Sequence, residues 1–146
     1  MQQAVSARAP VHLWIVGILS LLWNAFGSYD YLMTNLRNEA YLAAFPAEQL
    51  AYFDSLPGWL TAFWALGVWG GLAGALLLLA RSRHAVLAFG LSVVGIVVSF
   101  GYQMMATDMP ASMKQGVPAM MPWVIFIIGL AQLWYSRSVE KQGLLR

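Results

Sequence analysis

Polar side chains that could bind a ligand interrupt two long apolar stretches of this sequence. Asn24, Ser28 and Tyr31 are spaced to share one face of a helix. Tyr102 and Gln103 lie together in a later stretch. Amides, hydroxyls and aromatic rings suit a small neutral molecule such as a sugar, held by hydrogen bonds and stacking. These five residues are candidate ligand-binding residues in a small polar cavity, with hydrogen bonding between helices as the alternative interpretation.

Titratable groups are scarce in the apolar stretches. Asp30 is the acid found within them, at one edge, and we expect it to pair with Arg37 or a loop amide. His12 and His84 lie at the ends of stretches, near water, which does not suit haem ligands inside a bundle. Gln132 is a further polar residue in the last stretch. Coupled proton transport, which needs a titratable group in mid-membrane, is therefore not predicted.

The sequence offers little for catalysis, cofactors or metals. It has no cysteine, which excludes disulfides, cysteine nucleophiles and thiolate metal sites. Phosphate loops, HExxH, GxSxG and paired helical carboxylates are missing. Six methionines between residues 104 and 121 suggest Cu(I), but Pro110 breaks their spacing and no histidine or cysteine assists them. We expect no enzymatic activity, no cofactor and no metal.

Four glycines in the second apolar stretch could bring helices close together. Gly67 and Gly71, and likewise Gly70 and Gly74, are four residues apart, which places small residues on one helix face. We predict that this face packs against the neighbouring stretch, 85–106. A homo-oligomer seam or a face for a membrane partner subunit is the alternative.

These residues lie in four apolar stretches that predict transmembrane helices. Hydrophobic residues make up 60% of the chain and charged residues 10%, far below the roughly 25% typical of a soluble domain. The stretches cover residues 11–31, 57–80, 85–106 and 118–136. Each has about the 20 residues that a helix needs to cross the hydrocarbon core of a bilayer. The prediction is an all-α polytopic membrane protein, with 1–146 as one membrane domain that forms a four-helix up-down-up-down bundle.

Basic residues predict the orientation of this bundle. Six of the eight lysines and arginines fall on one side, against Arg37 and Lys114 on the other. The six are Arg8, Arg81, Arg83, Arg137, Lys141 and Arg146. Cytoplasmic loops carry such an excess, which predicts that both termini lie in the cytoplasm (N-in/C-in). The net charge of +2 and the absence of a basic cluster exclude nucleic acid and leave the lipid bilayer as the main partner.

The connections carry further signals. The first outer loop, 34–56, contains Pro46 followed by Glu48, which predicts a short helix that lies along the membrane interface or caps the bundle. The second outer loop covers 107–117, and a cytoplasmic tail covers 137–146. Small residues near 25–27 leave a cleaved signal peptide as an alternative for the first stretch, but tryptophans and tyrosines continue through it.

Several motifs resemble one family. Residues 22–27 read LWNAFG, residues 37–42 read RNEAYL, and similar runs occur at 64–74 and 81–84. Together they resemble a family of small, uncharacterised four-helix bacterial inner-membrane proteins, some of them labelled "sugar transporter". The resemblance covers most of 11–103. It implies a multi-pass inner-membrane protein that transports or conducts a small neutral polar solute such as a sugar. The alternative function is an accessory or scaffold subunit of a membrane complex.

Overall fold

The computed structural model of the chain describes residues 8–146, and residues 1–7 of the predicted domain lie outside this part. The prediction of an all-α protein is confirmed, because every regular element of residues 8–146 is helical. The four longest are α1 (Val11–Asn35), α4 (Gly58–Leu79), α5 (His84–Met105) and α6 (Gly116–Lys141). Each is long and apolar enough to cross a membrane, as the sequence predicts.

Two of the long helices extend beyond their predicted spans. α1 continues past residue 31 to Asn35, and α6 continues past residue 136 to Lys141. The helix of α1 stops where Arg37 adopts a positive φ of 53°, and that of α6 stops before Gly143, whose φ is 75°. Hydropathy marks the apolar part of a helix, whereas these local backbone conformations mark where the helix ends.

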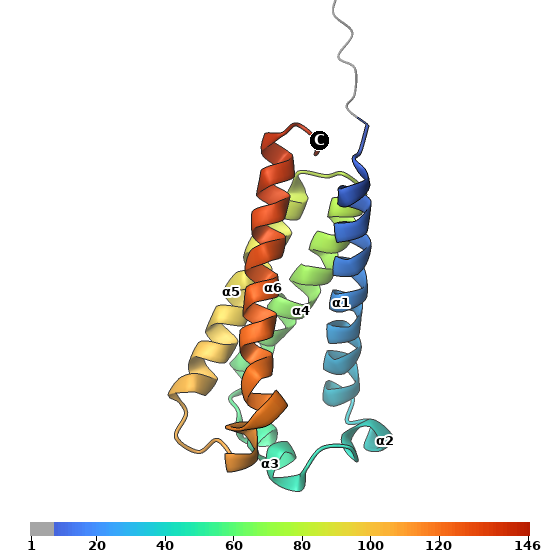
Figure 1. Cartoon of the computed structure of the whole chain (residues 1–146). Coiled ribbons are helices and arrows are strands. Elements are labelled where there is room, and N and C mark those ends of the chain that lie inside the picture. The colour runs from blue at the N-terminus through green and yellow to red at the C-terminus, as the bar shows by residue number, and fades with distance from the viewer. Residues whose placement is uncertain (1–7) are drawn as a thin grey trace, which may run out of the picture.

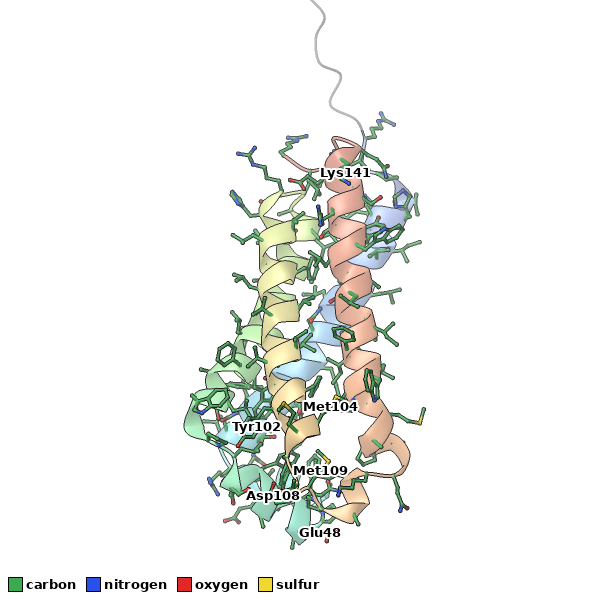
Figure 2. All side chains as sticks on the ribbon, turned by 90° about the vertical axis from the view of Figure 1, so that its left-hand side faces the viewer. Glu48, Tyr102, Met104, Asp108, Met109 and Lys141 are labelled. Carbon is green, nitrogen blue, oxygen red and sulfur yellow. The ribbon has the colours of Figure 1, made fainter. Side chains whose placement is uncertain are left out.

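The long helices alternate in direction, so the start of α1 and the C-terminus lie at the same end of the molecule (Figure 1). α4 packs against both α1 and α5, and α6 packs against α5. The turn between α4 and α5 is short, which makes these two helices antiparallel neighbours. Lys141 lies at one end of the bundle, while Glu48 and Asp108 lie at the other (Figure 2). We call them the inner and outer ends, following the predicted orientation.

The seam between α4 and α5 depends on glycine. A Cβ atom added to Gly95 of α5 would lie 2.5 Å from the backbone nitrogen of Gly67 and 2.5 Å from the carbonyl oxygen of Phe63. One added to Gly70 would lie 3.1 Å from the backbone nitrogen of Ser92. The two backbones therefore approach more closely than side chains would permit, which is how small residues stabilise helix pairs in membranes.

The inner end is closed by the last residues of the chain. The N–H of Arg146 donates to the carbonyl oxygen of Arg81 (2.7 Å), and the N–H of Arg83 donates to that of Arg146 (2.9 Å). This pairing holds Leu144 and Leu145 in a buried apolar cluster. The cluster also contains Leu13, Ala75, Leu78, Ala85, Phe89 and Val139. Apolar side chains therefore fill the inner end of the bundle.

The connection from α1 to α4 covers the outer end. It contains α2 (Glu39–Leu42) and α3 (Ala47–Ser55), and α3 begins after Pro46, where the sequence predicts a short helix. Arg37 and Asp54 form an ion pair of 2.9 Å across this connection. From α3, the Gln49 amide donates to the Ser112 hydroxyl (3.3 Å), which joins it to the 3₁₀ helix η1 (Ala111–Met113). In Figure 1, α3 lies below the ends of the long helices, as a cap.

Candidate functional site

Asn24 and Ser28 lie on one buried face of α1. Asn24 donates from its amide to the carbonyl oxygen of Ser20 (2.7 Å), and Ser28 donates from its hydroxyl to that of Asn24 (2.9 Å). Both side chains are buried. A Cβ atom added to Gly71 would collide with the Asn24 amide and would lie 3.4 Å from the Ser92 hydroxyl of α5. Asn24 therefore occupies a point where α1, α4 and α5 meet.

The four glycines of the predicted packing motif, Gly67, Gly70, Gly71 and Gly74, all face neighbouring helices of this chain. The Ser92 hydroxyl donates to the carbonyl oxygen of Gly67 (2.6 Å), across the seam with α5. Ser92 also lies against Gly70 and Gly71. Gly74 lies against the ring of Phe89. Because α1 and α5 fill this side of α4, the glycine face is not open to a partner.

Of the other three candidate residues, Tyr31 and Tyr102 make aromatic contacts, whereas Gln103 has no side-chain contact of this kind within residues 8–146. The ring of Tyr31 meets those of Trp64 and Trp69 edge to face, with centroids 4.9 and 6.0 Å apart. The ring of Tyr102 meets Trp59 edge to face at 5.5 Å. Gln103 is half-buried. The structure thus places Asn24 and Tyr31 in the α1–α4 contact, with Ser28 buried one turn after Asn24. Tyr102 of α5 lies beside Trp59, at the start of α4.

The outer end carries an unpaired hydroxyl and a tyrosine–carboxylate pair. Tyr52 of α3 is buried, and its hydroxyl has no partner within residues 8–146. Burial raises the pKa of Tyr52, and the negative charge of Asp108 adds to this effect. Tyr41 donates a hydrogen bond to Asp30. Burial is the larger cause that raises the pKa of Tyr41, and this hydrogen bond is the second. The expected pairing of Asp30 with Arg37 is wrong, because Arg37 reaches Asp54 instead.

Two surface hollows lie along α6, and the five candidate residues line neither of them. The first has about 460 Å³ and lies between α1 and α6. Its lining includes Val16, Ser20 and Trp23 of α1 and Ile128, Gln132 and Tyr135 of α6. We call this hollow the α1–α6 groove. The second has about 500 Å³ and is lined on α6 by Leu130, Leu133, Trp134, Arg137, Ser138 and Lys141.

Comparison with known proteins finds no match to this chain. No protein-family model, no curated protein and no solved structure matches this chain. Within residues 8–146, no three histidine, aspartate or glutamate side chains lie close enough together to hold a metal ion.

The sequence pattern found part of the α1–α6 groove and missed the rest. Gln132 stands out as an amide in an apolar stretch, but Ser20 is one serine among several. Trp23 and Tyr135 look like residues of a membrane boundary or packing surface. Only the placement of α1 beside α6 brings these four side chains to one hollow.

Proposed function

We propose that this chain is a multi-pass protein of a bacterial inner membrane that serves as a non-enzymatic subunit of a membrane assembly. The observation that carries the proposal is the exposure of α6. Only 11% of its apolar span is buried, against 28% in α4 and in α5. The helix packs on α5 and leaves its outward side uncovered.

The uncovered side of α6 has the residues of a helix-packing face. Large apolar side chains repeat there at intervals of three and four residues, the spacing found along the seam between paired helices. They are Met120, Trp123, Ile127 and Leu130, and we call them the outward face of α6. Trp123 is 53% exposed and Ile127 is 62% exposed. We infer that a transmembrane helix of a partner subunit packs on this face.

The glycine face of α4 does not serve this docking role. Its four glycines contact α1 and α5, so a partner helix has no access to them without separating the bundle. The proposed docking surface therefore lies on α6 and not on α4, where the sequence suggests it.

Gentle detergent extraction followed by mass measurement tests the subunit role. We expect a hetero-complex of defined stoichiometry that is lost when Trp123→Ala and Ile127→Ala are combined. The matched control combines Leu22→Ala and Phe26→Ala, which truncate exposed side chains of α1, and it should keep the complex. A chain that extracts alone or only as a homo-oligomer contradicts the proposal, as does a complex that survives the change in α6.

Transport of a small neutral polar solute such as a sugar is the second candidate function. The observation that favours it is that the hydroxyls of Ser99 and Tyr52 are buried without partners within residues 8–146. Hydroxyl groups of a solute would satisfy them. Tyr102 and Gln103 follow Ser99 on α5, and Asn24, Ser28 and Tyr31 complete the predicted site on α1. Sugar uptake into vesicles should fall in Asn24→Ala; unchanged uptake of every sugar tested would remove this candidate.

A further inference from the structure

Two polar side chains in the α1–α6 groove are buried without hydrogen bonds. Ser20 is 6% exposed and Gln132 is 8% exposed. Within residues 8–146, the Ser20 hydroxyl and the Gln132 amide make no hydrogen bond, although the carbonyl oxygen of Ser20 accepts one from Asn24. Within residues 8–146, the fully enclosed side-chain atoms without a partner are the hydroxyls of Tyr52 and Ser99. The Ser20 and Gln132 groups therefore stay accessible from the groove that they line, where a polar atom of a ligand can bind them.

Both groups lie inside the predicted membrane spans. Ser20 is nine residues from the start of the first span at residue 11, and Gln132 is four residues from the end of the last span at residue 136. At 1.5 Å per residue, they lie about 14 Å and about 6 Å from the inner edge of the apolar spans. Both positions fall within a hydrocarbon core about 30 Å thick. Water-soluble molecules are scarce at that depth, whereas lipid-soluble molecules are concentrated there.

The walls of the groove define the chemistry of its ligand. The remaining lining is apolar or aromatic, with Trp23 on α1 and Trp134 and Tyr135 on α6. Among residues 8–146, those that line the groove carry no charged side chain. The Tyr135 hydroxyl is engaged by the His12 ring nitrogen Nδ1 at 2.5 Å, which ties α1 to α6 beside the groove. A neutral ligand is therefore favoured, and flat aromatic walls favour a flat head group.

The size of the groove fits such a molecule. Its volume of about 460 Å³ lies within the range of roughly 300–1,000 Å³ that small-molecule sites occupy. The groove opens sideways along the bundle, between two helices that face the bilayer. An apolar tail of the ligand can thus remain among the lipid chains while the head group enters.

We propose that the α1–α6 groove binds a neutral, lipid-soluble molecule with a flat, carbonyl-bearing head group. The Gln132 amide and the Ser20 hydroxyl donate hydrogen bonds to its carbonyl oxygens, and the tryptophan rings cover the faces of the head group. The groove wall meets the outward face of α6 at Trp134, four residues after Leu130. The site goes beyond the proposed subunit role, because its hydrogen-bonding groups, Ser20 and Gln132, do not belong to that face.

Quenching of tryptophan fluorescence by decylubiquinone tests this site, with the purified full chain in phosphatidylcholine nanodiscs. Decylubiquinone supplies the carbonyl-bearing ring and the apolar tail, and Trp23 and Trp134 lie in the groove wall. Gln132→Met keeps the length of the side chain and removes the amide. Gln115→Met, at the start of α6 and outside the groove, is the matched control.

We expect saturable quenching in the wild type and in Gln115→Met, with binding weakened at least about tenfold in Gln132→Met. The melting temperature of Gln132→Met should stay the same or rise, because an amide without a partner has been removed from an apolar groove. Equal affinity in Gln132→Met, quenching that does not saturate, or full competition by dodecane would overturn the proposal. If Gln132→Met unfolds, Ser20→Ala decides in its place: weaker binding supports the site, and unchanged binding overturns it.

Discussion

Gly95 and Gly101 lie on the same helix and differ in what surrounds them. A Cβ atom at Gly95 meets rigid backbone atoms of α4 at 2.5 Å, whereas one at Gly101 meets nothing within 4 Å. Backbone atoms cannot move aside as the end of a flexible side chain can. The position of a glycine relative to α4 therefore decides whether α5 tolerates an added methyl group.

Gly95→Ala should lower the free energy of unfolding by about 1–3 kcal/mol, because the helices must separate to admit the methyl group. Gly101→Ala should leave it unchanged or raise it by up to about 1 kcal/mol, since alanine favours the helix. Thermal unfolding of the two variants in detergent measures the difference. Equal melting temperatures would show that α4 and α5 do not approach as closely as described.

Two tyrosines at the outer end predict opposite effects of removing a hydroxyl. Tyr41 donates to the Asp30 carboxylate, so Tyr41→Phe should lower the free energy of unfolding by about 1 kcal/mol. The buried hydroxyl of Tyr52 has no partner within residues 8–146, so Tyr52→Phe should be neutral or stabilising. Denaturation of both variants at neutral pH checks the contrast. A larger loss in Tyr52→Phe than in Tyr41→Phe would contradict it.

The pKa of Tyr41 also predicts how stability depends on pH. Burial and the bond to Asp30 raise the pKa of Tyr41 above its ordinary value near 10, so the folded chain holds this proton more tightly than the unfolded chain. Its contribution to stability is complete below about pH 10 and is lost as the pH rises further. Melting temperatures across the alkaline range should therefore fall less steeply in Tyr41→Phe. Parallel curves for the variant and the wild type would contradict this linkage.

At the scale of elements, the C-terminal segment packs into the inner end of the helix bundle. Leu144 and Leu145 are buried beside Val139 and Leu13, and backbone hydrogen bonds tie Arg146 to the turn between α4 and α5. Leu145→Ala should lower the free energy of unfolding by about 2 kcal/mol. Leu130→Ala, on the exposed side of α6, is the matched control and should change it little. Similar melting temperatures for the two variants would show that the segment does not pack into the bundle.

The sequence predicts where the helices form better than it predicts which helices pack against each other. Continuous apolar stretches predict four long helices, and Pro46 predicts the start of α3, because both signals are local. The spacing of Asn24 and Ser28 correctly places them on one face of α1. It does not reveal that this face meets α4, since periodicity gives the direction of a face and not its partner.

The residues of the α1–α6 groove likewise could not be grouped from the sequence. Ser20 and Gln132 come together only because α1 and α6, the first and last long helices, lie beside one groove. No local pattern encodes that proximity. Likewise, the choice of Tyr41 as the partner of Asp30 depends on the path of the connection after α1. Contacts that depend on how separate helices pack need the whole fold.

At the scale of the whole molecule, we propose that the four long helices cross a membrane with the basic end inside. The inner end is filled by the C-terminal segment, and the outer end is covered by α3 and η1. The groove and the outward face of α6 both lie between these ends, toward the bilayer. All proposed interactions of this protein thus take place within the membrane.

Labelling of single cysteines from outside the cell tests this arrangement most directly, because the chain contains no cysteine of its own. Gln115→Cys, before α6, and Gln142→Cys, after it, place exposed thiols at opposite ends of the same helix. With a maleimide that cannot cross the inner membrane, position 115 should react in cells with a permeabilised outer membrane. Position 142 should react only after the inner membrane is broken. Labelling of position 142 in intact cells, or of both positions equally, would contradict the account.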